Sequence, residues 1–156
     1  MIGEAIFIVP AWDNNIRTMF KPSLDGISDD CFPDGSDPAY VTFFKNSKDP
    51  HYTSGVANHF FYLLAEGVVV PSGYDAGTPA NLGPSDLVCN GNTGLAGIGR
   101  DAAAKIWYTA LTTYMVSNTD YAGARVATLQ AAVDLYGDGS ANHAAVAAAW
   151  DAVNVH

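Results

Sequence analysis

The fold of this chain is decided by residues 53–67, which read TSGVANHFFYLLAEG. Apolar side chains recur in this stretch at helical spacing, so that they share one face: Val56, Phe60, Phe61, Leu63 and Leu64. The hydroxyls of Thr53 and Ser54 can cap the start of a helix, and Gly67 is suited to end it. The stretch therefore predicts an amphipathic helix with one buried face.

Three further helices are predicted toward the carboxyl end. Residues 100–115 combine an apolar stripe with good helix formers. Residues 121–136 predict a helix whose inward face carries Ala124, Leu129, Ala132, Val133 and Leu135. That helix should stop at Gly137, after which Ser140 caps a last helix whose inward face carries Val146, Ala149, Trp150 and Val153. Because no heptad or repeat is evident, we expect a mainly α fold, an irregular orthogonal helical bundle.

Two segments predict loops rather than helices. Residues 20–50 are rich in proline, glycine and aspartate, and residues 68–97 contain further proline and glycine turns. Long loops in compact domains are usually functional. One cysteine lies in each segment, Cys31 and Cys89, and the sequence leaves open whether they form a disulfide or are two unrelated thiols.

Composition excludes two kinds of partner. The chain has 156 residues, enough for about one domain, and 49% are hydrophobic. Its formal net charge of -9 would repel nucleic acid and anionic membranes, so we expect neither as a partner. No stretch approaches the ~20 apolar residues of a transmembrane helix, and the first residues do not resemble a targeting segment.

The sequence contains no HExxH, GxSxG, phosphate-loop or CxxC motif, and what remains is Asp49-Pro50-His51 at the start of the predicted helix. A carboxylate beside an imidazole can orient it as a hydrogen-bond donor to an oxyanion. Alternatively, Asp49 and Ser54 merely cap the helix, with His51 packed beside them. The other histidines are better explained as structural: His59, His143 and His156.

Arg17 is the second polar candidate. Its planar fork of donors suits a carbonyl or carboxylate, although a surface ion pair with Asp13 would explain it equally well. Glu4, Asp13 and the acids of residues 25–37 offer oxygen ligands for calcium. They lack the DxDxDG spacing, however, and a solvated acidic loop is the commoner case.

Five groups of residues occur here in a characteristic order. They are IGE (2–4), IRTM (16–19), DPHYTSGV (49–56) with FYLL (61–64), GIGRD (97–101) with IWYTAL (106–111), and AVDLYG (132–137) with AV (152–153). Together they resemble the C-terminal helical domain of thermolysin-like zinc metalloendopeptidases, the neutral proteases. The resemblance implies one domain over residues 1–156, with a loop-rich, cleft-lining segment at 1–50 and a helical bundle at 51–156.

The resemblance also implies site roles. His51 corresponds to the histidine that stabilises the oxyanion of the tetrahedral intermediate, Asp49 to the acid that orients it, and Arg17 to a residue that binds the substrate backbone. Glu4 matches a calcium-ligating glutamate whose partners lie upstream in the family. Three isoleucines would line the pocket for a bulky apolar side chain after the scissile bond: Ile2, Ile6 and Ile16.

In this family the zinc ligands and the general base belong to an N-terminal domain that precedes the segment matched here, so we expect no zinc ligand in this chain. Met1 would be an internal residue of a secreted protease, inactive without its HExxH half. The implied partners are a peptide or protein substrate and the chain's own N-terminal catalytic domain. The alternative is a catalytically empty helical module that binds a peptide, an inhibitor or that N-terminal half, and dimerises through its exposed cleft face.

Overall fold

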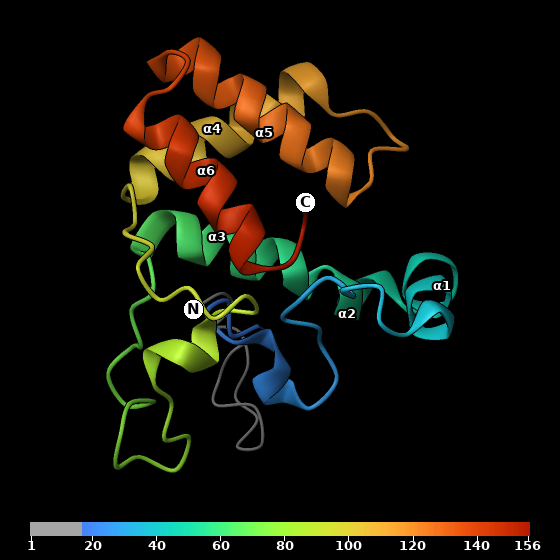
Figure 1. The fold of residues 1–156 in the computed structure, drawn as a ribbon, viewed down its shortest axis with the longest axis vertical. Coiled ribbons are helices and arrows are strands. Elements are labelled where there is room, and N and C mark those ends of the chain that lie inside the picture. Colours follow the sequence, from blue (N-terminus) through green and yellow to red (C-terminus); the bar gives the residue numbers. More distant parts are fainter. Residues whose placement is uncertain (1–16) are drawn as a thin grey trace. The chain divides into compact units, whose positions relative to one another are not determined.

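The computed structural model describes residues 17–156, in which the regular elements are helices (Figure 1). In chain order they are η2 (Pro22–Asp25), α1 (Pro38–Asn46), α2 (Pro50–Thr53), α3 (Gly55–Glu66), η3 (Pro84–Leu87), α4 (Arg100–Thr109), η4 (Ala110–Tyr114), α5 (Tyr121–Tyr136) and α6 (Ala141–Ala152). An isolated antiparallel bridge pairs Gly67 with Ala96. The prediction of a mainly α fold is confirmed.

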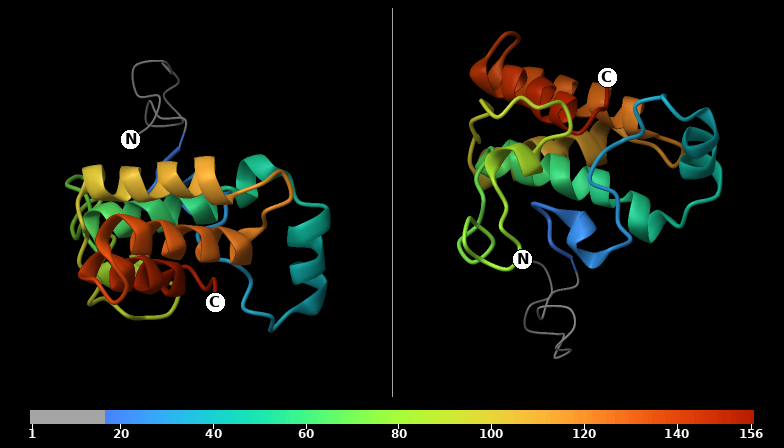
Figure 2. Two further views of the ribbon diagram at one scale, coloured as in Figure 1. Left: turned by 90° about the horizontal axis from the view of Figure 1, so that it is seen from above. Right: turned by 60° about the horizontal axis from the view of Figure 1, so that its bottom comes forward.

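The chain divides into two compact units, Met1–His59 and Phe60–His156. The described part of the first unit contains η2, α1, α2 and the start of α3. The second unit contains the end of α3 and all later helices, and α4, α5 and α6 lie against one another there in both Figure 1 and Figure 2.

Aromatic stacking organises the core of the second unit. The rings of Phe60 and Trp150 stack with centroids 3.7 Å apart and planes 11° from parallel, and both side chains are fully buried. The indole Nε1 of Trp150 donates to the hydroxyl of Thr128 at 2.8 Å, so the one polar atom of the ring keeps a partner. The predicted inward face of α6 is confirmed, since Val146, Ala149 and Trp150 are buried.

The buried face of α5 matches the predicted one only in part. Ala124 and Ala132 are buried as predicted, whereas Leu135 is 41% exposed. Three side chains outside the predicted inward face are also buried: Ala127, Thr128 and Ala131. Small side chains on this face let α6 approach α5 closely. The predicted stripe of residues 100–115 likewise breaks where α4 passes into the π-helical turn η4, and Leu111 is 52% exposed there.

Two glycines allow the turn after α3 to lie against the segment before α4. A Cβ on Gly97 would come 2.4 Å from the carbonyl oxygen of Ala65, and one on Gly67 would come 2.6 Å from the backbone nitrogen of Gly97. Gly67 also has a φ of +76°, which other residues rarely adopt. Both positions therefore need glycine, and Gly67 ends α3 as predicted.

The prediction of one continuous loop over residues 20–50 is wrong, because α1 lies within it. Asp37 caps this helix by accepting the backbone N–H groups of Ala39 and Tyr40, and Pro38 occupies its first turn. Proline in a first turn costs no hydrogen bond, so the Asp-Pro pair starts a helix instead of preventing one. Because aspartate and proline are also frequent in loops, the composition of residues 20–50 does not distinguish this helix start from a loop.

Neither cysteine is free, since both Cys31 and Cys89 are disulfide-bonded. Among the described residues, every helix is too short or too polar to cross a membrane.

Candidate functional site

Asp49 holds His51 by two contacts at once. Its Oδ1 accepts the backbone N–H of His51 at 2.9 Å, which caps α2, and lies 2.7 Å from Nδ1 of the imidazole. Capping and pairing, posed above as alternatives, are thus made by the same oxygen. Pro50 lies between Asp49 and His51, and its ring fixes its φ. The backbone that connects the carboxylate to the imidazole therefore has little conformational freedom.

The pair is exposed and polarised. The side chain of His51 is 86% accessible, and that of Asp49 50%. The two hydrogen bonds from His51, the backbone bond first and the ring bond second, lower the pKa of Asp49. An ionised carboxylate can only accept, so the proton lies on Nδ1, and Nε2 is left to face a ligand.

The backbone of His51 receives two further hydrogen bonds. Nη2 of Arg17 donates to its carbonyl oxygen across 34 residues of sequence, and the Ser54 hydroxyl donates to the same oxygen at 3.2 Å. Ser54 therefore does not cap the following helix with its hydroxyl, as the sequence predicts, because Asp49 starts α2 first. The structure brings Arg17 and His51 together, a contact that no spacing rule indicates.

Several predicted site residues lie outside the described residues. These are Ile2, Glu4, Ile6, Asp13 and Ile16. The apolar pocket, the calcium-ligating glutamate and the proposed ion pair with Asp13 therefore remain predictions.

Two acids of the 25–37 loop, Asp25 and Asp30, are engaged by nearby side chains. Asp25 accepts from the backbone and hydroxyl of Ser28, and Asp30 does the same with Ser23 and also pairs with Lys21 at 2.8 Å. Although burial opposes it, the bonds from Ser28 lower the pKa of Asp25. Asp25 and Asp30 are thus both engaged by hydrogen bonds with neighbouring serines.

Residues 17–156 do not fit a zinc site. They contain no group of three or more His, Cys, Asp and Glu side chains placed to hold a metal ion. His59 is fully buried, with Nδ1 3.0 Å from the carbonyl oxygen of Asp30, and Nδ1 of His143 accepts the backbone N–H of Gly139. Both therefore have the structural roles that the sequence favours.

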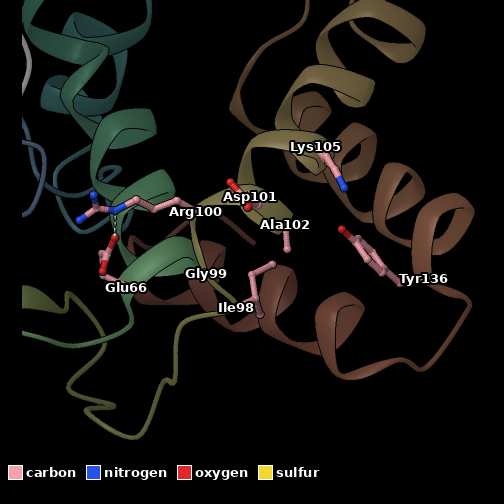
Figure 3. A pocket seen from close by; sticks show the side chains of 8 residues that line it. All are labelled: Glu66, Ile98, Gly99, Arg100, Asp101, Ala102, Lys105 and Tyr136. Carbon is pink, nitrogen blue, oxygen red and sulfur yellow. Dashed lines mark hydrogen bonds and ion pairs between the residues drawn. The ribbon is translucent and has the colours of Figure 1, made fainter.

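An open pocket of about 600 Å³ lies in the second unit, where the turn before α4 meets the ends of α3 and α5 (Figure 3). Charges of both signs line it, and Arg100 pairs with Glu66 at its edge. It contains neither member of the Asp49–His51 pair. Its exposed, mixed lining gives no preference for one class of ligand.

The fold and the site define a mainly helical domain that presents a carboxylate-bound histidine, with an arginine beside it, to solvent. The chain belongs to the thermolysin metallopeptidase family, because the sequence model of that family's alpha-helical domain matches residues 1–155.

Named proteases are similar over almost the whole chain. The transglutaminase-activating metalloprotease of Streptomyces mobaraensis is 46% identical over 157 residues, which cover 99% of this chain and 18% of the relative. Neutral protease B of Bacillus subtilis (strain 168) is 30% identical, and the thermolysin of Alicyclobacillus acidocaldarius subsp. acidocaldarius 32% identical, each over 99% of this chain and 24% of the relative. The chain thus spans a quarter or less of the length of these relatives.

Proposed function

We propose that this chain is the helical half of the active-site cleft of a secreted zinc metalloendopeptidase that cleaves before bulky apolar residues. The observation that carries the proposal is the Asp49–His51 pair with Arg17 bound to the same short segment. Zinc would be held by another part of the complete protease, since HExxH does not occur in this sequence. The disulfide-bonded cysteines support an oxidising, extracellular compartment.

His51 would act as a hydrogen-bond donor. Asp49 orients the ring through Nδ1, so that Nε2 of the protonated imidazole can donate to the oxyanion that forms when the scissile carbonyl becomes tetrahedral. The negative charge appears only as the reaction proceeds, so this bond strengthens toward the transition state. A donor held in place by its neighbour needs no reorganisation at that moment.

Arg17 would bind the substrate backbone. A guanidinium has five N–H donors, and the bond from Nη2 to the carbonyl of His51 leaves others for a substrate carbonyl. We expect Arg17→Ala in the complete protease to reduce kcat/KM by about 10- to 100-fold, the worth of one charged hydrogen bond. Arg17→Lys should not restore it, because an ammonium lacks the fork. Full activity of Arg17→Ala in peptide-hydrolysis kinetics would remove Arg17 from the site.

A domain exchange tests the proposed function itself. This chain would replace the matching segment of the Streptomyces relative, and hydrolysis of a quenched peptide with Leu after the scissile bond would be measured with and without a chelator. We expect chelator-sensitive cleavage by the chimera, weaker cleavage when Asp replaces Leu, and none by the isolated chain. The zinc-dependent role is wrong if the isolated chain itself shows chelator-sensitive turnover.

A chimera that folds and secretes but does not cleave would favour the other function, a catalytically empty module that binds a peptide, an inhibitor or its own N-terminal half. Self-association of the isolated chain in sedimentation experiments would then become the relevant property.

A further inference from the structure

A partly buried cluster of polar side chains includes Lys48, the residue that directly precedes Asp49 in the chain. Nζ of Lys48 is 2.8 Å from Oδ1 of Asp29, and the hydroxyl of Tyr40 donates to the same oxygen at 2.7 Å. The side chains of Lys48 and Asp29 are only 15% and 11% exposed. We call these three residues the Lys48 cluster.

The charges in the Lys48 cluster depend on one another. Burial opposes the charge on Lys48, but the hydrogen bonds with Asp29 and Tyr40 outweigh it and raise the pKa of Lys48. Burial first, and then the bond to Asp29, raise the pKa of Tyr40, which therefore stays a donor. Removing one member would leave another partly buried without its partner, so the cluster resists rearrangement.

The cluster ties three segments together. The backbone N–H of Asp29 donates to the carbonyl of Tyr52 in α2 at 3.2 Å, and a Cβ on Gly55 would come 2.3 Å from the carbonyl oxygen of Asp29. The backbone N–H of Lys48 donates to the carbonyl oxygen of Phe43 in α1 at 2.8 Å. The loop that contains Asp29 therefore contacts α2 at Tyr52 and α3 at its first residue, Gly55. Lys48 connects the same loop to the end of α1.

We propose that Asp29 and Lys48 are positioning residues for the Asp49–His51 pair, holding its segment from both sides. Neither touches the reacting atoms: Lys48 anchors the residue next to Asp49, and Asp29 anchors α2 at Tyr52. The inference rests on the proposed function for its catalytic meaning. Its geometric content, that the pair loosens when the cluster is broken, is independent of cleavage.

The direction in which the pKa of Asp49 changes in the variant Asp29→Asn distinguishes positioning by the cluster from a direct electrostatic effect. The titratable side chain that contacts Asp49 is His51; Arg17 bonds to the carbonyl of His51, and Lys48 and Asp29 pair with each other in the adjoining cluster. Asp29→Asn removes a negative charge, and this alone would lower the pKa of Asp49 further. If the cluster positions the pair, the same change weakens the hydrogen bonds from His51 and raises the pKa of Asp49 toward its ordinary value of 3.8.

The experiment is a carboxyl-carbon NMR titration of this chain and its variants. We expect Asp29→Asn and the uncharged change Tyr40→Phe to shift the pKa of Asp49 upward. Asp34→Asn, which removes a charge from the same loop without touching the cluster, should not. The pKa of Asp25, lowered by Ser28 in the same unit, should remain low and so report that the unit is folded.

An Asp49 pKa that falls or stays unchanged in Asp29→Asn would overturn the proposal. So would a rise that Asp25 shares in both Asp29→Asn and Tyr40→Phe, because the cluster would then only stabilise the fold. Either result leaves the proposed protease function standing, since that depends on cleavage by the chimera. Inactivity of the chimera would conversely leave the positioning result intact.

Discussion

Replacing His51 with Ala in the complete protease is expected to reduce turnover by about 100- to 1000-fold, the usual cost of removing one oxyanion donor. The side chain is 86% exposed and its ring contacts Asp49, so its loss should disturb the site without disturbing the core. The effect should fall on kcat more than on KM, because the bond to the oxyanion exists only as charge develops. Initial-rate kinetics of the chimera measure both constants.

The matched control is His143→Ala, which removes an imidazole from the first turn of α6 in the other compact unit. Its turnover should remain near that of the parent protease. An unchanged rate in His51→Ala would exclude His51 from the mechanism, and an equal loss in both variants would indicate damage to the fold.

Trp150→Ala is expected to lower the free energy of unfolding by about 3–5 kcal/mol, the range for deleting a large buried aromatic side chain. The indole is fully buried and stacks on Phe60. It also meets the ring of Tyr121 edge-on, with ring centroids 6.2 Å apart. Its loss would leave a cavity and strand the hydroxyl of Thr128 without its donor. Urea unfolding followed by circular dichroism measures the change.

Two variants sharpen this test. Trp150→Phe keeps a ring on Phe60 but loses the bond from Nε1 to Thr128, so its cost should be smaller than that of Trp150→Ala. Val126→Ala, on the 66% exposed face of α5, should change stability by no more than about 0.5 kcal/mol. Equal stability of Trp150→Ala and Val126→Ala would show that Trp150 is not central to the core.

The sequence predicts the later helices well because their signals are local. Ser140 accepts the backbone N–H of His143 and starts α6 as expected, and Gly67 and Gly137 follow the ends of α3 and α5. Caps and glycines act within one helical turn, so a linear reading detects them. The sequence does not predict the short helix α1, because proline and aspartate are also typical of loops and only the order Asp37-Pro38 marks a helix start.

The site was only partly predictable for a similar reason. Asp49 and His51 are two residues apart, and their pairing follows from one short motif. Arg17 and Asp29 are brought to this segment by hydrogen bonds with His51 and Lys48 across 34 and 19 residues, which no local pattern encodes.

What the amino-acid sequence determined by itself was therefore the helical class, the family and the Asp49–His51 pair, because periodicity, capping and short motifs depend on neighbours in the chain. Tertiary structure alone decided which residues surround that pair and that Leu135, predicted to lie inward on α5, remains exposed while Ala127 and Ala131 are buried. Packing between helices selects side chains by shape at a contact, and the identity of that contact is set by segments distant in sequence.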